Sequence, residues 1–117
     1  MPLIELDTSC DLSDADKRQA LAKTLSALAA EEIGKPERYV MACVRDQVAM
    51  TMSGGSDACA LVTIKSIGGL TRPVNQALSA RIAQTLQEEL ALAPDRVYVT
   101  FEELAPTHWG FNGNTFG

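Results

Sequence analysis

The stretch Pro36-Glu37-Arg38 reappears 58 positions later in the chain as Pro94-Asp95-Arg96. Further matches lie at the same offset: Leu12-Ser13 with Leu70-Thr71, Leu28 with Leu86, Glu31 with Glu89, and Ile4-Glu5-Leu6 with Val62-Thr63-Ile64. Self-similarity at one fixed offset indicates an internal repeat. We therefore predict a single domain over residues 1–117 that consists of two similar structural repeats, at about residues 1–58 and 59–117.

The first half has the pattern of a strand, a helix and a second strand. Leu3 to Leu6 is a short apolar run that is typical of a strand. A helix is predicted from an N-cap at Ser13 to about Ile33, where Gly34 is placed to end it in the left-handed conformation. Its apolar side chains recur at helical spacing: Leu21, Ala22, Leu25, Leu28, Ala29 and Ile33. The β-rich run Tyr39–Val44 follows.

The second half repeats this pattern. Ala60 to Ile67 is predicted as a strand, and Thr71 can cap the helix that follows it. The apolar side chains of that helix recur every four residues: Val74, Leu78, Ile82, Leu86 and Leu90. Pro94 marks its end, and Arg96–Phe101 is the last main strand. Between the halves, Val48–Met52 is predicted as a short extra strand.

Two strand–helix–strand units in tandem predict an α+β fold. Because such units have right-handed crossovers, they give a four-stranded mixed sheet, plus short extra strands, with both helices on one face. The other face of the sheet is left bare, and we expect it to carry many Val, Ile, Met and Ala side chains. A chain of 117 residues has nothing else to cover that face, so we expect an oligomer.

Composition and charge exclude several classes of protein. The net charge is −5 and no basic stripe is visible, so no nucleic-acid partner is expected. No uncharged stretch, the apolar run Ala58–Ile64 included, reaches the ~20 apolar residues of a membrane helix, so no membrane partner is expected. The single histidine, His108, has no cluster of metal-ligand residues around it, and no metal site is predicted.

The cysteines and the start of the chain predict a location. Three cysteines form an odd set without framework spacing, which favours free thiols in a reducing compartment. Met1 to Glu5 has neither the basic region nor the apolar core of a secretion signal. The chain is therefore expected to be cytoplasmic.

Pro2 is the first candidate for chemistry. Methionine is normally removed before a small residue such as proline, which would leave a secondary amine at the start of the chain. An exposed α-amino group has a pKa of about 7.7–8.0, and burial or a nearby cation lowers it. Such an amine suits proton abstraction next to a carbonyl. The alternative is that Met1-Pro2 merely begins a strand.

Other candidates have equally plain structural alternatives. Lys35 can bind a substrate carboxylate, or it can complement the C-terminal end of the first helix. The stretch 66–69, Ser-Ile-Gly-Gly, can hold an anion on its amides or form a simple turn. The aromatic side chains can line a pocket or pack in the core: Tyr39, Tyr98, Trp109, Phe111 and Phe116.

Taken together, these stretches resemble a known family. The stretches are Met1-Pro2-Leu3-Ile4, Gly34 to Tyr39, Cys59-Ala60-Leu61, Ser66-Ile67-Gly68, Pro94 to Tyr98 and Asn114-Thr115-Phe116. In their order and spacing they resemble the macrophage migration inhibitory factor family of the tautomerase superfamily. The resemblance implies a homotrimer whose three sheets surround a central channel, with three active sites at the subunit boundaries.

The resemblance also implies roles for residues. Pro2 would be the catalytic base and Lys35 would bind the substrate carboxylate, while Ile67 would offer a backbone contact. Tyr98 would reach in from the neighbouring subunit. Four positions match the pocket wall and rim: Tyr39, Trp109, Phe111 and Phe116. The implied activity is that of a phenylpyruvate tautomerase-type isomerase, which converts the keto and enol forms of an α-keto acid without a cofactor.

Departures from the animal members qualify the resemblance. Thr100 stands where the animal cytokine has an asparagine that lines the site, so hydrogen bonding to the substrate is expected to differ. Phe111 replaces a tryptophan and Trp109 a valine, and Val62 replaces the second redox cysteine, so thiol-oxidoreductase activity is not expected. His108 has no counterpart with a role to transfer. The alternative function is a cytokine-like ligand of a cell-surface receptor, exported without a leader and with a vestigial pocket.

Overall fold

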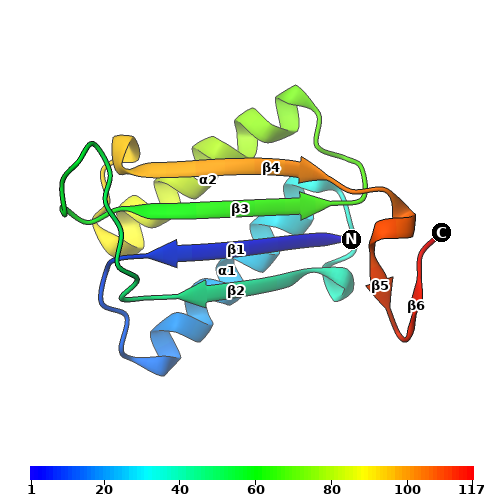
Figure 1. Ribbon diagram of the computed structural model, residues 1–117, viewed down its shortest axis with the longest axis horizontal. Helices are drawn as coiled ribbons and strands as arrows, with labels where there is room; N and C mark the ends of the chain where they lie inside the picture. Colours follow the sequence, from blue (N-terminus) through cyan, green and yellow to red (C-terminus); the bar gives the residue numbers. More distant parts are fainter.

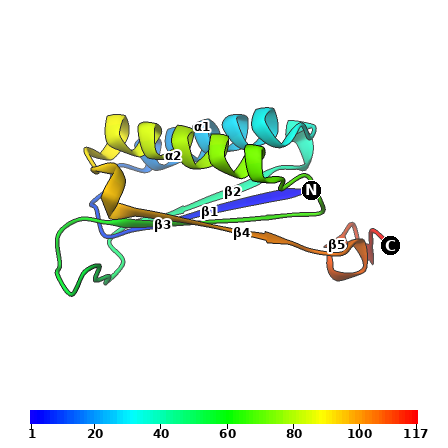
Figure 2. The same ribbon diagram turned by 90° about the horizontal axis from the view of Figure 1, so that it is seen from above.

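The computed structural model describes residues 1–117 as a four-stranded sheet with two helices on one face (Figures 1 and 2). The first half contains β1 (Pro2–Thr8), α1 (Ala15–Ile33), the 3₁₀ helix η1 (Glu37–Tyr39) and β2 (Met41–Arg45). The second half contains β3 (Ala60–Ser66), α2 (Arg72–Leu90), η2 (Pro94–Arg96) and β4 (Val97–Glu103). The tail contains η3 (Pro106–His108), β5 (Gly110–Phe111) and β6 (Asn114–Thr115). Both halves therefore have the same order of elements.

The sheet is mixed, with the strand order β2-β1-β3-β4. β2 runs parallel to β1 and β4 parallel to β3, while the central strands β1 and β3 are antiparallel. In that central pair Pro2 faces Ser66 and Thr8 faces Ala60, so the first residue of each strand faces the last residue of the other. The halves are thus related by an approximate twofold axis between β1 and β3. The predicted fold class is confirmed.

The core lies between the sheet and the helices. Alternate residues of the central strands, such as Ile4 and Ile64, are fully buried against the helix layer. The buried side chains of α1 include Leu21, Leu25, Leu28, Ala29 and Ile33, and those of α2 are Leu78, Ile82 and Leu86. The helical spacing of apolar residues predicted these faces correctly. Neither helix is both long enough and apolar enough to cross a membrane.

The helix ends differ from the prediction at two points. Asp14, not Ser13, is the N-cap of α1, because its carboxylate accepts from the amides of Asp16 at 2.9 Å and Lys17 at 3.4 Å. Gly34 ends α1 with a φ of 74°, as predicted. Thr71 caps α2, also as predicted, but that helix ends at Leu90, where Ala91 adopts a φ of 56°.

The predicted extra strand Val48–Met52 does not form. The backbone turns away from β2 at Gln47, whose φ is 54°, and the amide of Val48 donates to the carbonyl of Thr8 at 3.0 Å. Further on, Met52 makes only an isolated bridge with Gly55. The Arg96 guanidinium holds this loop by donating to the carbonyls of Met52, Asp57 and Ala58 at 2.7–3.2 Å. The short extra strands of the molecule are instead β5 and β6.

The open face of the sheet is more polar than predicted. The strand register places three rows of side chains on it: Met41, Leu3, Lys65 and Glu102; then Cys43, Glu5, Thr63 and Thr100; then Arg45, Asp7, Leu61 and Tyr98. The Val and Ile side chains of the central strands occupy the alternate positions and point to the helices. Arg45 bonds Asp7 at 2.6 Å and Glu5 at 2.9 Å, and both raise its pKa. The expectation of an apolar bare face was therefore wrong.

Candidate functional site

Four segments of the chain meet at one end of the sheet, which we call the Pro2 end. β1 begins there with Pro2, which faces Ser66 at the end of β3. β2 begins there as well, since Met41 is in register with Leu3, and Tyr39 therefore lies level with Met1. After β4, the amide of Leu104 donates to the carbonyl of Ser66 at 2.9 Å. The N-terminus and the C-terminal tail lie beyond this end of the sheet (Figure 1).

Pro2 lies in surroundings that disfavour a positive charge. Its side chain is fully buried, and Met1 before it is half-buried. Burial, and then the positive charge of Lys35, lower the pKa of the N-terminal amino group of Met1. The nitrogen of Pro2 is one residue further into the same surroundings. An amine there would be held neutral at a lower pH than an exposed one.

Lys35 lies against the loop that follows β3. Gly34 ends α1 in the left-handed conformation and so directs the half-buried Lys35 toward the Pro2 end. The loop residue Gly69 approaches closely: a Cβ atom there would lie 3.0 Å from Cγ2 of Ile33 and 3.6 Å from Cε of Lys35. The same loop carries Ile67, which is half-buried. The structure thus brings Pro2, Lys35 and Ile67 to one end of a single chain.

The aromatic side chains of the tail gather at the same end. Phe111 contacts Tyr39 edge to face, with ring centroids 6.1 Å apart, and stacks on Phe116 at 5.6 Å. The amide of Phe116 donates to the carbonyl of Trp109 at 3.2 Å, which closes the β5–β6 hairpin. Phe111 remains 56% exposed. Three of the predicted pocket-wall residues, Tyr39, Phe111 and Phe116, therefore form an aromatic group beside the Pro2 end. Trp109 is half-buried in the same tail, and His108 lies exposed in η3 just before it.

Tyr98 and Thr100 lie away from Pro2 in the same chain. Tyr98 is in register with Leu61, which faces Asp7, so it is level with the far end of β1. Five strand residues separate that level from Pro2, which is roughly 16 Å. Tyr98 is 65% exposed on the open face, and Thr100 is exposed two residues further along the strand. One chain alone does not bring these two residues to the predicted site.

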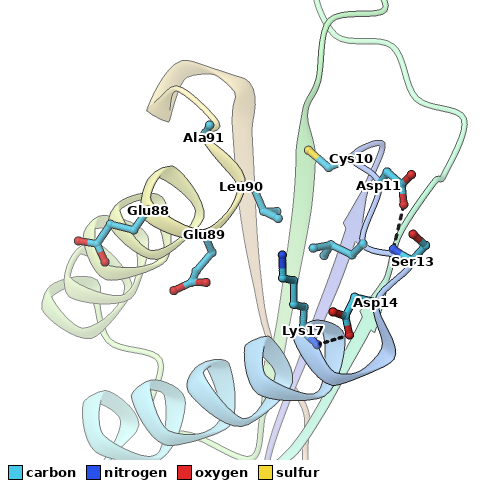
Figure 3. Close-up of a pocket in the computed structure, with 10 residues that line it drawn as sticks. Cys10, Asp11, Ser13, Asp14, Lys17, Glu88, Glu89, Leu90 and Ala91 are labelled. Carbon is cyan, nitrogen blue, oxygen red and sulfur yellow. Dashed lines mark hydrogen bonds between the residues drawn. The ribbon is translucent and has the colours of Figure 1, made fainter.

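A different hollow lies at the opposite end of the sheet (Figure 3). It is lined by the loop after β1 and by the C-terminal end of α2, with Asp11, Asp14, Glu88 and Glu89 near Lys17. It contains none of the predicted site residues. No group of three His, Cys, Asp or Glu side chains is arranged to hold a metal ion in this hollow or elsewhere in the chain.

The sequence named Ser66 as part of the stretch 66–69 but gave its side chain no role. The hydroxyl of Ser66 is fully buried opposite Pro2, and its Oγ atom has no hydrogen-bond partner. The only sequence signal is a polar residue at an inward position of a strand whose other inward residues are apolar. That signal acquires a meaning only once the register of β1 against β3 is known.

Comparisons with known proteins identify relatives along the whole chain. A family model described as macrophage migration inhibitory factor (MIF) matches residues 1–117. A macrophage migration inhibitory factor homolog from Brugia malayi is 33% identical over 117 residues and covers 100% of both chains. D-dopachrome decarboxylase-B from Xenopus laevis is 39% identical over 114 residues, which cover 97% of this chain and 95% of its own. The crystal structure of a homologue from Prochlorococcus marinus superposes with a TM-score of 0.92 at 37% identity, covering 98% of this chain and 99% of that one.

Proposed function

Because the chain belongs to the macrophage migration inhibitory factor family of the tautomerase superfamily, we propose that it is a keto–enol tautomerase acting on α-keto acids such as phenylpyruvate. Pro2, freed of Met1, is the general base, and no cofactor takes part. The observation that carries the proposal is the position of Pro2: it is buried at the start of β1, next to the Met1 amino group, whose pKa is lowered by burial and by Lys35.

The reaction needs one base that both takes and returns a proton. The neutral Pro2 nitrogen takes the enol proton, and the electron pair of that O–H bond forms the carbonyl while the α-carbon accepts the proton from the nitrogen. The keto form reacts by the reverse steps, so the nitrogen ends each cycle neutral. A base that is neutral near the working pH is the efficient one, and burial and a nearby cation produce that state.

Lys35 binds the substrate carboxylate and stabilises the negative charge that develops on the substrate oxygen. Its position against the Gly69 loop restricts the side chain at the Pro2 end. The backbone of Ile67 in that loop offers a further contact. Tyr39, Trp109, Phe111 and Phe116 form the wall and rim, where an aromatic substrate ring would pack on exposed aromatic side chains.

The site is completed by a second copy of the chain. Tyr98 and Thr100 are too far from Pro2 within one chain, yet Tyr98 is a large exposed side chain on an outer strand. β2 and β4 form the edges of the sheet, and an edge strand has unpaired backbone groups available to a neighbour. A closed homotrimer that pairs these edges brings Tyr98 and Thr100 of one copy to the Pro2 end of the next.

Replacement of the proline tests the proposal. Pro2→Gly keeps a free N-terminus but removes the secondary amine, and we expect phenylpyruvate tautomerisation to fall by at least about 100-fold, as is typical for loss of a general base. The trimer should persist in size-exclusion chromatography, because the side chain removed is one of many in the core. In the unaltered protein, mass spectrometry should show that activity follows the fraction of chains without Met1. Full activity in Pro2→Gly, or in chains that retain Met1, would refute the role of Pro2.

A further inference from the structure

Ser66 carries a buried hydroxyl without a partner. The residue is fully buried at the last position of β3, and its Oγ atom is one of two buried side-chain polar atoms in the chain that make no hydrogen bond, the other being Oδ1 of Asn75. Buried polar groups in folded proteins almost always have a partner. An unpaired hydroxyl directly opposite the proposed base therefore needs an explanation.

While Met1 is attached, the Pro2 nitrogen cannot be the partner of this hydroxyl. Pro2 and Ser66 face each other in the antiparallel pair, where Cβ atoms of directly opposed residues are about 4.5–5.5 Å apart. While Met1 is attached, the Pro2 nitrogen is a tertiary amide that has neither a hydrogen to donate nor a basic lone pair. Removal of Met1 converts the same atom into a secondary amine, which can donate and accept.

The opposite end of the β1–β3 pair shows what a hydroxyl at this position reaches. Thr8 ends β1 as Ser66 ends β3, and it is also fully buried. Its Oγ1 atom donates to the carbonyl of Cys59 at 2.9 Å. Cys59 precedes Ala60, the first residue of the facing strand, just as Met1 precedes Pro2. By the approximate twofold symmetry, the Ser66 hydroxyl lies beside the Met1–Pro2 bond, where the Met1 carbonyl corresponds to that of Cys59. Ser66 Oγ makes no bond to this carbonyl, and removal of Met1 leaves the Pro2 nitrogen as the polar backbone atom at this place.

We propose that Ser66 Oγ accepts a hydrogen bond from the freed Pro2 nitrogen and stabilises this nitrogen while it carries the proton of the substrate. The inference rests on the proposed function. A protonated secondary amine has two N–H groups, so one can point to Ser66 and the other to the substrate. The bond is stronger when the donor is charged, and Ser66 therefore raises the pKa of Pro2 against the combined effect of burial and Lys35. Ser66 is a positioning residue that acts through Pro2.

The pH dependence of activity tests this role. In Ser66→Ala we expect the acid limb of the kcat/KM profile for phenylpyruvate to move down by on the order of one pH unit, because the ammonium loses its hydrogen bond. On the plateau kcat should fall several-fold with KM unchanged. Ser66→Thr keeps the hydroxyl and should restore the profile. A titration of the ¹⁵N-labelled Pro2 nitrogen by NMR should show the same downward shift in Ser66→Ala without any turnover.

Thr8→Val is the matched control. It removes the equivalent buried hydroxyl at the far end of β1, whose bond to Cys59 is structural. It should lower the melting temperature and leave the acid limb in place. An acid limb and a ¹⁵N titration that stay unchanged or move up in Ser66→Ala would overturn the inference, even where Pro2→Gly is inactive. An active Pro2→Gly would instead refute the proposed function, and the ¹⁵N titration would still decide whether Ser66 contacts the nitrogen.

Discussion

At the scale of single residues, Lys35 has two separable effects on the Pro2 end. Its charge lowers the pKa of the Met1 amino group, and we expect the same effect on the Pro2 amine once Met1 is removed. Its ammonium group is the proposed partner of the substrate carboxylate. The base must be neutral, so activity is lost as the pH falls through the pKa of that amine. Removing the positive charge of Lys35 raises this pKa, and the acid limb then lies at a higher pH. This direction is opposite to the one expected for Ser66→Ala.

Lys35→Met should therefore show two changes at once. We expect KM for phenylpyruvate to rise by roughly 10- to 150-fold, which corresponds to about 1.5–3 kcal/mol for a hydrogen bond to a charged group. The acid limb of the kcat/KM profile should move to higher pH. Lys23→Met is the matched control, since Lys23 is exposed in the middle of α1, the helix that ends just before Lys35. A lower kcat at constant KM would contradict the carboxylate-binding role.

At the scale of elements, the contact between the loop after β3 and the end of α1 can be tested with two glycines. Gly68 and Gly69 have φ values of 71° and 82°, a region in which any other residue is strained. Alanine at either position should cost roughly 1–2 kcal/mol of stability. Only at Gly69 would the added Cβ meet Ile33 and Lys35, because nothing lies within 4 Å of such an atom at Gly68.

Gly69→Ala should crowd Cγ2 of Ile33, shift the end of α1 together with the adjoining Lys35 and so raise KM. Gly68→Ala should lower the melting temperature and leave KM close to that of the unaltered protein. Melting curves and steady-state kinetics on both variants measure the two effects separately. Equal KM values in the two variants would show that the loop does not position Lys35.

The elements also show how much of the fold can be predicted from the sequence. The helices were predictable because their apolar side chains recur at helical spacing, and Gly34 and Thr71 act locally as caps. The strand predicted at Val48–Met52 failed because strand formation depends on a partner, and Gln47 and Arg96 direct this segment away from the sheet. The N-cap differed by one residue because Asp14 competes with Ser13 for the same amides.

The candidate site was predictable in part. Pro2, Lys35 and Ile67 followed from the resemblance to the family, and the structure brings them together. The role of the Ser66 hydroxyl was missed because it depends on facing Pro2 across two strands that 51 residues of the chain separate. The polarity of the open face was missed for a related reason: the alternation along each strand was visible, but which set faced the helices depended on the register.

At the scale of the whole molecule, the distance between Tyr98 and Pro2 predicts complementation between inactive copies. Mixed trimers of Pro2→Gly and Tyr98→Ala should regain activity, because random assortment leaves about one quarter of the sites with both residues intact. A mixture of Pro2→Gly with Lys35→Met should regain none, since both residues come from the same chain. Activity no greater than the sum of the separate variants in the first mixture would show that Tyr98 does not serve a neighbouring site.

The approximate twofold symmetry of the fold gives two equivalent corners, but only one of them can hold a reactive amine. Ala60 occupies in the second half the place that Pro2 occupies in the first, but its nitrogen is joined to Cys59 in the middle of the polypeptide. A chain has a single beginning, so a duplicated unit can supply a terminal amine to only one of its two equivalent corners. The other corner therefore lacks a terminal amine by connectivity alone.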